Sequence, residues 1–294
     1  MRKIRLQFLS HPIPSSVLYN SGDVDTLHLC ITINDISMKS AFERFKQLHE
    51  VKELLVLPNA WDARSAAILG EIGYKAIGTS SAAVASALGY ADGQNMTFDE
   101  YLMVIKRIVA SINVPLTVDL EMGYGTTPAA IYANARQLAD IGVAGINLED
   151  STLSASKRTL GKAEQFAATI QYIKDNLQRD GKSLFINARC DTYLLKVSDA
   201  RKESARRAKL YASAGADGLF LPMITQEEDI VDAVAASALP LNVMCIPGLP
   251  DFAKLESLGV QRASMGPFLM MKAYGDVKDL ASKVLQEKTF QSIL

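Results

Sequence analysis

An alternation of strand-like and helix-like segments is the feature that most constrains the fold of this chain. From about Leu54 onward, short runs of β-branched and aliphatic residues alternate with amphipathic stretches, and a glycine stands near the end of most of these stretches. Such an alternation predicts right-handed βαβ units and a parallel sheet. The expected strands cover residues 54–59, 75–80, 116–121, 144–150, 184–191, 218–223, 241–246 and 261–266.

Eight strands of this kind close naturally as a (β/α)8 TIM-type barrel, an α/β fold, which is the fold that we expect. Helices are expected over residues 97–111, 128–140, 162–178, 200–213 and 227–236. An open doubly wound sheet is the alternative. It is disfavoured because the first strand leads into Pro58-Asn59-Ala60-Trp61-Asp62 and not into a glycine-rich phosphate loop.

The two ends of the chain depart from the repeat. Residues 1–37 are expected to form a loose N-terminal extension, and residues 38–294 a single barrel domain with C-terminal helices. Two such helices are expected, over 268–274 and 277–287. Their apolar side chains exceed what the outer layer of one barrel needs, so we expect a C-terminal helix to be exchanged between subunits.

Charge and cysteine usage exclude several classes of partner. The 294 residues include 31 basic and 32 acidic side chains, with no long block of one sign, which argues against nucleic acid and against a membrane surface as partners. No apolar run approaches the roughly 18–20 residues that span a membrane. The three cysteines, Cys30, Cys190 and Cys245, show no metal-site spacing and cannot all pair, which predicts a reducing, cytoplasmic location.

Carboxylates end two neighbouring strands. Asp119 and Glu121 close the third expected strand and share one face, because side chains alternate along a strand, and Glu149 closes the fourth. Buried like charges are unfavourable unless a cation lies between them, and a hard divalent ion is the natural one. The alternative is a buried ion network of these three carboxylates with Arg189.

Other polar residues follow strand ends in the same place. After the second strand, the amides of the turn around Ser80, Ser81 and Ala82 could hold a carboxylate. Asp92 either joins a metal shell or caps a turn before a glycine. The fifth strand places Asn187, Arg189 and Asp191 on one face, where the arginine is either a salt-bridge partner or a bidentate clamp for a substrate carboxylate.

Several nearby residues receive structural roles. Asp62 is expected to cap the helix that starts at Ala63. Asp150 alternates away from its neighbour Glu149, so we expect it to cap or to pair behind the strand. Cys190 is expected to be a packed thiol. Lys157 and Arg158 are either solvated loop charges or close over substrate.

From Met38 to the end, the sequence resembles the isocitrate lyase/phosphoenolpyruvate mutase superfamily. Six segments in the right order carry the resemblance, which makes it specific. They are Leu57-Pro58-Asn59-Ala60-Trp61-Asp62, Thr79-Ser80-Ser81-Ala82, Leu88-Gly89-Tyr90-Ala91-Asp92-Gly93, Asp119-Leu120-Glu121-Met122-Gly123-Tyr124-Gly125, Gly145-Ile146-Asn147-Leu148-Glu149-Asp150-Ser151 and Ile186-Asn187-Ala188-Arg189-Cys190-Asp191.

The resemblance implies a ligand set and an assembly. It implies that Asp92, Asp119, Glu121 and Glu149 bind Mg²⁺, with Mn²⁺ as the alternative, partly through water. It also implies that Ser80, Ser81, Ala82 and Arg189, with Asn187 on the same face as the arginine, grip a 2-oxo acid carboxylate. Members of this superfamily form homodimers or homotetramers with exchanged C-terminal helices, and the same is expected here.

One departure from the family limits the expected chemistry. The family's lyases carry a cysteine that acts as acid and base in a mobile loop after strand four, whereas residues 151–161 here contain neither cysteine nor histidine. The expected function is a Mg²⁺-dependent lyase that cleaves or decarboxylates a small 2-oxo acid through a metal-stabilised enolate. The proton donor is then water, Tyr90 or a residue of the 151–161 loop.

Two other functions remain open. A degenerate family member would bind a 2-oxo acid without turnover. A mutase or hydrolase would act on the P–C bond of phosphonopyruvate, but the lysines that such enzymes carry close behind the Glu-Asp pair are replaced here by Ser151 and Leu153, with Lys157 displaced.

Overall fold

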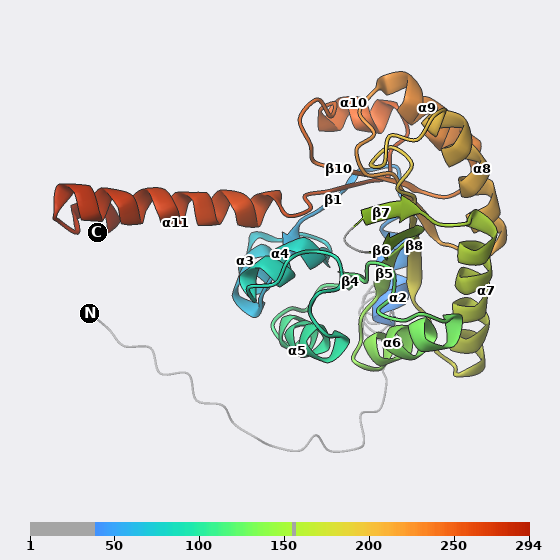
Figure 1. Ribbon diagram of the computed structural model, residues 1–294, viewed down its shortest axis with the longest axis horizontal. Helices are drawn as coiled ribbons and strands as arrows, with labels where there is room; N and C mark the ends of the chain where they lie inside the picture. The colour runs from blue at the N-terminus through green and yellow to red at the C-terminus, as the bar shows by residue number, and fades with distance from the viewer. Residues whose placement is uncertain (1–38, 155–156) are drawn as a thin grey trace, which may run out of the picture. The chain divides into compact units, whose positions relative to one another are not determined.

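A ring of parallel strands forms the centre of the computed structural model, which describes residues 39–154 and 157–294 (Figure 1). In the sheet the strands follow the order β1-β11-β10-β9-β8-β5-β4-β3-β2. Their bounds are β1 Leu55–Leu57, β2 Asn59–Ala60, β3 Ile77–Thr79, β4 Leu116–Asp119, β5 Gly145–Glu149, β8 Phe185–Arg189, β9 Gly218–Phe220, β10 Leu241–Met244 and β11 Arg262–Ser264. All eight expected strands are confirmed.

The first expected strand consists of two short strands, β1 and β2, which together close the barrel. Pro58 separates β1 from β2, because proline has no N–H with which to continue a ladder. β1 pairs with β11 and β2 pairs with β3, so the two halves of one strand join the two ends of the sheet order. The prediction of a (β/α)8 barrel is confirmed, and the open doubly wound alternative is wrong.

Helices surround the strands, and Figure 1 shows α6 to α10 following one another around the outside. Their bounds are α2 Ala41–Gln47, α3 Ala63–Ile72, α4 Ser81–Ala87, α5 Phe98–Val109, α6 Pro128–Asp140, α7 Ala163–Arg179, α8 Ala200–Ser213, α9 Glu227–Ala236, α10 Phe252–Ser257 and α11 Phe268–Glu287, with a short 3-10 turn at Gln291–Ile293. The five helices expected from the sequence are confirmed to within a residue or two.

Local sequence explains where these helices begin and end. Thr97 and Glu100 form a reciprocal capping box at α5, and Asp62 caps α3 as expected. Thr127 caps α6, and Pro128 occupies its first position, where no amide donor is lost. Gly73 ends α3 with a φ of 97°, backbone that glycine adopts without strain.

Helix α2 packs against the end of the barrel where the strands begin. Phe45 is fully buried, and its ring lies edge-on to Phe185 with the centroids 5.3 Å apart. His49 stacks on the same phenylalanine at 4.4 Å, and burial lowers the pKa of its imidazole to about 3, so this histidine is a neutral packing group. A Cβ on Gly145 would stand 2.8 Å from the carbonyl oxygen of Phe185, so the strands and α2 fit together only with glycine there.

Two parts of the expected fold are corrected. The two expected C-terminal helices are one continuous helix, α11, because Gly275 interrupts the apolar pattern without breaking the backbone. The expected loop after Glu149 contains an antiparallel hairpin, β6 (Ser151–Ser154) with β7 (Lys157–Leu160). The expected extension over residues 1–37 lies outside the described residues.

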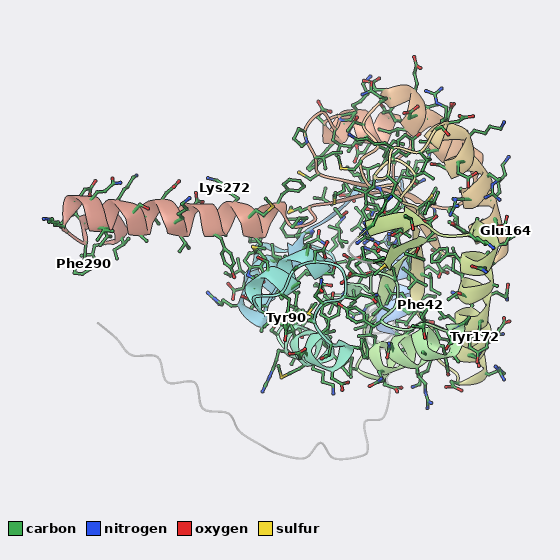
Figure 2. The ribbon with its side chains drawn as sticks, in the orientation of Figure 1. Phe42, Tyr90, Glu164, Tyr172, Lys272 and Phe290 are labelled. Atoms are coloured by element: carbon green, nitrogen blue, oxygen red, sulfur yellow. The ribbon has the colours of Figure 1, made fainter. Side chains whose placement is uncertain are left out.

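Most of α11 packs against no other helix or strand of the barrel. Met270 is its only buried residue, whereas Val277 and Leu285 are 62% and 80% exposed. Figure 2 shows side chains standing out from it on all sides, from Lys272 to the labelled Phe290 that follows it. Exchange of this helix between subunits stays a prediction. In the described part of the chain, no helix is both long and apolar enough to cross a membrane.

Candidate active site

Asp119 is the last residue of β4, and its side chain is held by Ser81, the first residue of helix α4. The Ser81 hydroxyl donates to its Oδ2 at 2.8 Å, and the Ser81 amide donates to the same oxygen at 3.4 Å. The other carboxylate oxygen, Oδ1, is buried and has no hydrogen-bond partner among the described residues. The carboxylate is therefore fixed by one oxygen and has the second left for a cation or a donor.

Glu121 follows in an unusual backbone conformation. Its φ is 51°, a left-handed value that costs a non-glycine residue energy and that often marks a functional site. Tyr124 donates from its hydroxyl to Oε1 at 2.9 Å, while Oε2 is buried without a partner among the described residues. Burial, followed by the charges of Asp119 and Asp92, raises the pKa of Glu121 to about 8.

Glu149, at the end of β5, lies between two arginines. Its Oε2 is 2.9 Å from Nη1 of Arg189, and its Oε1 accepts from Nη1 of Arg158. Burial raises the pKa of this carboxyl to about 7, although the two guanidiniums oppose that shift. The alternative of an ion network that includes Arg189 is thus correct for Glu149, whereas Asp119 and Glu121 make no ion pair with a described residue.

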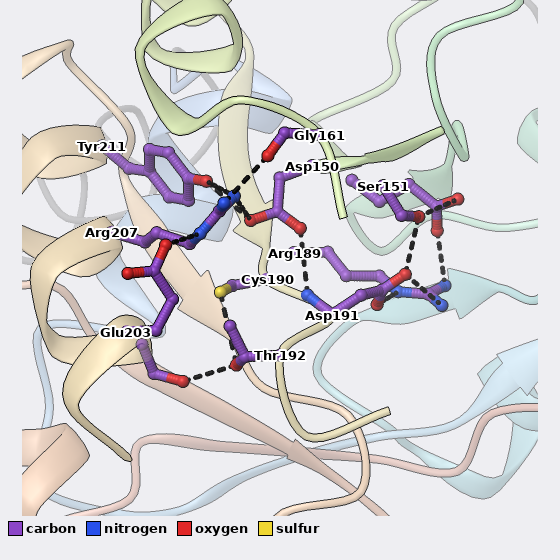
Figure 3. Close-up of polar contacts among 12 residues, drawn as sticks. Asp150, Ser151, Gly161, Arg189, Cys190, Asp191, Thr192, Glu203, Arg207 and Tyr211 are labelled. Atoms are coloured by element: carbon purple, nitrogen blue, oxygen red, sulfur yellow. Dashed lines mark hydrogen bonds and ion pairs between the residues drawn. The ribbon is translucent and has the colours of Figure 1, made fainter. Parts of the chain in front are cut away.

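Arg189 is engaged by carboxylates of the protein itself. Besides its contact with Glu149, its Nε donates to Oδ1 of Asp191 at 2.7 Å and its Nη2 to Oδ2 at 3.4 Å. Asp191 also accepts from the Ser151 hydroxyl at 2.8 Å. Figure 3 shows Arg189, Asp191 and Ser151 close to one another. Binding of a substrate carboxylate by Arg189 stays a prediction.

Arg158 is the site residue on which the sequence was least decisive. It projects from β7 of the hairpin, and its Nη1 also donates to the Ser151 hydroxyl at 2.9 Å and lies 3.5 Å from Asp191. Its side chain is 19% exposed, whereas Lys157 beside it is an exposed residue. The hairpin therefore directs one of its two neighbouring cations into the site.

The loop with Asp92 is joined to the loop with Glu121. With its amide oriented to suit its neighbours, Gln94 accepts hydrogen bonds from the amides of Met122, Gly123 and Tyr124 at 3.0–3.2 Å. Asp92 belongs to an exposed segment, yet partial desolvation and the charge of Asp119 raise the pKa of its carboxyl. The structure thus brings Asp92 into the electrostatic field of the other carboxylates.

The remaining expected site residues lie at different depths. The Ser80 side chain caps α4 by accepting from the Ala83 amide, and Ala82 lies in the first turn of that helix. Asn187 is fully buried inside the barrel and donates to Asn147 at 2.9 Å, beneath the level of Arg189 on β8. The Tyr90 hydroxyl donates to Glu100 at 2.6 Å on the outside of the barrel (Figure 2), so this structure does not bring it to the carboxylates.

Asp150 faces away from the site into a second buried network, as its alternation predicted. It accepts from Arg207 at 2.8 Å, from the Tyr211 hydroxyl at 2.6 Å and from the Asp191 amide at 3.0 Å (Figure 3). Arg207 also donates to the carbonyl of Gly161 at 2.8 Å. This network ties together β5, β8, α8 and the base of the hairpin.

Cys190 is part of the layer between barrel and helices, which confirms the packed thiol expected from the sequence. It is fully buried, and burial raises the pKa of its thiol well above the usual value. Cys245 is exposed. Cys190 therefore offers no preformed thiolate to the carboxylate cluster.

The residues present fit a hard divalent cation. Carboxylate oxygens are the ligands that Mg²⁺ prefers, and Asp119 and Glu121 each keep a buried oxygen without a partner among the described residues. Within residues 39–154 and 157–294, no three carboxylate, histidine or cysteine side chains stand close enough together to enclose a metal unaided. Mg²⁺ commonly binds one or two carboxylates and keeps several waters, so these two observations agree.

Comparisons with known proteins identify the family of this chain. A family model described as phosphoenolpyruvate phosphomutase matches residues 45–285. An uncharacterized protein of Mycobacterium tuberculosis is 38% identical over 222 residues, which cover 76% of this chain and 81% of that protein. The 2-methylisocitrate lyase of Bacillus subtilis is 28% identical over 216 residues, covering 72% and 68%. A crystal structure from Burkholderia cenocepacia, assigned provisionally as a phosphonomutase, has a TM-score of 0.76 and 36% identity and covers 81% of this chain and 97% of that one.

A parallel barrel with carboxylates gathered at the carboxyl ends of neighbouring strands has the layout of a barrel enzyme, and the named relatives are lyases and mutases. The chain belongs to the phosphoenolpyruvate phosphomutase family, within the isocitrate lyase/phosphoenolpyruvate mutase superfamily. The resemblance seen in the six sequence segments is thereby confirmed.

Proposed function

We propose that this protein is a Mg²⁺-dependent carbon–carbon lyase that acts on a small 2-oxo carboxylic acid. One observation carries the proposal. Two carboxylates, Asp119 and Glu121, each keep a buried oxygen without a partner, at the end of the barrel where enzymes of this fold bind substrate. Buried carboxylates in this state are stabilised either by a bound proton or by a cation, and no described lysine or arginine forms an ion pair with either one.

The metal would be held by Asp119, with Asp92, Glu121 and Glu149 acting directly or through water. When bound, it supplies Lewis-acid polarisation of an oxygen on the substrate. Ser81 keeps Asp119 oriented through its two hydrogen bonds. Arg158 and Arg189 supply positive charge on the side of Glu149, where an anionic substrate would enter.

Oxaloacetate-like decarboxylation ranks first among the reactions, because it needs the least acid–base equipment. The hairpin segment 151–161 contains no cysteine or histidine, and the Tyr90 hydroxyl is paired with Glu100. The same two facts favour the second candidate, a protein that binds a 2-oxo acid without turnover.

One assay separates these functions. Oxaloacetate, methylisocitrate-type hydroxy acids and phosphonopyruvate are each incubated with the protein and Mg²⁺, and pyruvate release is followed against an EDTA control. Metal-dependent pyruvate from one of the first two supports the lyase. Binding of oxalate without any turnover supports the binding protein, and pyruvate with inorganic phosphate from phosphonopyruvate supports P–C chemistry.

The Arg189→Lys variant tests carboxylate recognition. Lysine keeps the charge but loses the planar fork that contacts Glu149 and Asp191 and that would clamp a substrate carboxylate. We expect oxalate to bind the Mg²⁺-loaded variant more weakly by roughly 1.5–3 kcal/mol, the scale of a hydrogen bond to a charged group. Calorimetric affinity equal to that of the wild type would make Arg189 a counter-ion only.

Mg²⁺ binding is expected to release protons near neutral pH. Because the pKa of Glu121 is raised to about 8, its carboxyl is largely protonated at pH 7 in the metal-free protein and must lose that proton to bind a cation. Mg²⁺ affinity should therefore rise between pH 6 and pH 9. Calorimetry in buffers of different ionisation enthalpy measures the released protons, and Glu121→Gln is the control that should release fewer.

The same shift has a consequence for stability. The folded pKa of Glu121 lies above the unfolded value of 4.5, so its contribution is fully present below that value and is lost as the pH rises through about 8. In EDTA the unfolding temperature should fall over this range, and Mg²⁺ should restore it. A metal-free protein whose stability is constant from pH 5 to pH 9 would contradict this assignment.

A further inference from the structure

The interior of the barrel is polar where such barrels are usually filled by aliphatic side chains. Asn147 of β5 and Asn187 of β8 are buried neighbours in the sheet register and share a hydrogen bond of 2.9 Å. Arg262 of β11 is 2% exposed, and its Nη2 reaches the same Asn147 oxygen at 3.4 Å. Because β11 and β5 are not adjacent in the sheet, this arginine crosses the barrel interior.

Arg262 is a buried cation without a carboxylate in contact. None of the ion pairs in the described residues includes it, and its Nε and Nη1 have no hydrogen-bond partner there. Its guanidinium lies 5.7 Å from the ring of Phe45, which packs at the opposite end of the barrel from the site. Burying an uncompensated charge of this kind costs free energy. The charged form of Arg262 must therefore be stabilised by negative charges that are not in direct contact with it.

The position of Arg262 identifies the compensating charge. Asn147, which it contacts, is the register partner of Asp119 on the neighbouring strand β4. The arginine therefore lies beneath the carboxylates of the candidate site. Burial lowers the pKa of Arg262, and the negative charge of Asp119 partly opposes this effect, so that the pKa is about 9.

The charges around the site balance only when Arg262 is included. Arg158 and Arg189 are paired with Glu149 and Asp191. Three further carboxylates, Asp92, Asp119 and Glu121, have no ion-pair partner among the described residues. Once Glu121 has lost its proton, one positive charge beneath the three carboxylates leaves an excess of two negative charges, which a single divalent cation neutralises.

We propose that Arg262 is a positioning residue that sets the charge of the candidate site from within the barrel, so that the site holds one divalent cation together with an anionic substrate. The guanidinium touches neither ligand. It repels the cation, which limits how tightly the metal is held, and it attracts the anion. This inference rests on the proposed function.

The test is the opposite response of the two ligands when the charge is removed. In Arg262→Met, Mg²⁺ should bind roughly 200-fold more tightly and oxalate should bind the Mg²⁺-loaded protein roughly 200-fold more weakly, the effect of one charge acting on a doubly charged ligand over about 10 Å at an effective dielectric of 20. Both affinities are measured by calorimetry on the full chain, without reference to turnover. The unfolding temperature should be unchanged or higher, because a desolvated charge has been replaced by an apolar side chain.

Two further variants separate charge from packing. Arg262→Gln is also neutral but keeps a donor for Asn147, so it should shift both affinities in the same directions, and it serves if the methionine variant does not fold. Arg64→Met removes a positive charge from the exposed surface of α3, where the side chain is 75% exposed, and should change neither affinity.

The outcomes distinguish this inference from the proposed function. If the wild-type protein binds neither Mg²⁺ nor oxalate, the proposed function fails and the inference fails with it. If the wild type binds both, but the neutral variants weaken both ligands together or change neither, the proposed function stands and the charge-setting role of Arg262 is overturned.

Discussion

Replacing Asp119 with alanine is expected to abolish Mg²⁺-dependent binding of oxalate or pyruvate while leaving the barrel folded. One carboxylate oxygen of Asp119 accepts a hydrogen bond from Ser81, and the other is buried without a described partner. Losing it removes the anionic ligand that would hold the metal. Calorimetry with Mg²⁺ and oxalate measures the loss, and circular dichroism confirms that the fold persists.

A control uses an aspartate that lies outside the candidate site. Asp140 at the end of α6 forms an exposed ion pair with Lys182, so Asp140→Ala should leave ligand binding unchanged. Unchanged oxalate affinity in the Asp119 variant would remove the metal assignment. In that case the cluster would have to be read as a structural charge network.

Replacing Asp150 with alanine is expected to destabilise the protein by roughly 3–5 kcal/mol, the usual cost of breaking a buried ion pair. The change removes the acceptor of the Asp191 amide and of Nη1 of Arg207, both buried, although the guanidinium keeps its contacts with Glu203 and the Gly161 carbonyl. Denaturant unfolding in EDTA measures the change without a contribution from bound metal.

The surface pair of Lys272 and Asp276 provides the comparison. It is an i,i+4 pair on α11 with both side chains more than half exposed, so Asp276→Ala should cost no more than about 0.5 kcal/mol. If Asp150→Ala costs as little as this control, the network around Arg207 contributes nothing to the stability of the barrel.

The sequence predicted the barrel because its strands are buried on both faces and its helices carry strong boundary signals. Pro58 was not recognised as an interruption of the first strand, yet it only divides that strand between the two ends of the sheet order. The break expected near Gly275 was wrong, because one glycine costs a helix only about 1 kcal/mol, and α11 continues through it.

The candidate site was predicted less completely than the fold. Alternation along β5 was enough to separate Glu149 from Asp150, since successive side chains face opposite sides of a strand. The same alternation could have revealed Arg262, a charged residue at an inward position of an expected strand.

The direction of the Arg158 side chain could not be predicted, because it depends on the pairing of β6 with β7, and that segment shows little apolar periodicity. Tyr90 belongs to the same sequence segment as Asp92, but its contact with Glu100 depends on where α5 begins.

The base of the hairpin has a consequence for how relatives of this protein can diverge. Gly161 donates to the carbonyl of Asp150 at 2.8 Å and accepts from Arg207, and a Cβ on this glycine would lie 2.6 Å from that carbonyl. The first and last residues of the segment from Asp150 to Gly161 are thus fixed to the barrel through their backbone and through Arg207. The hairpin is an exchangeable module, in which mutation can replace side chains such as Arg158, while the framework proposed to bind the metal is inherited unchanged.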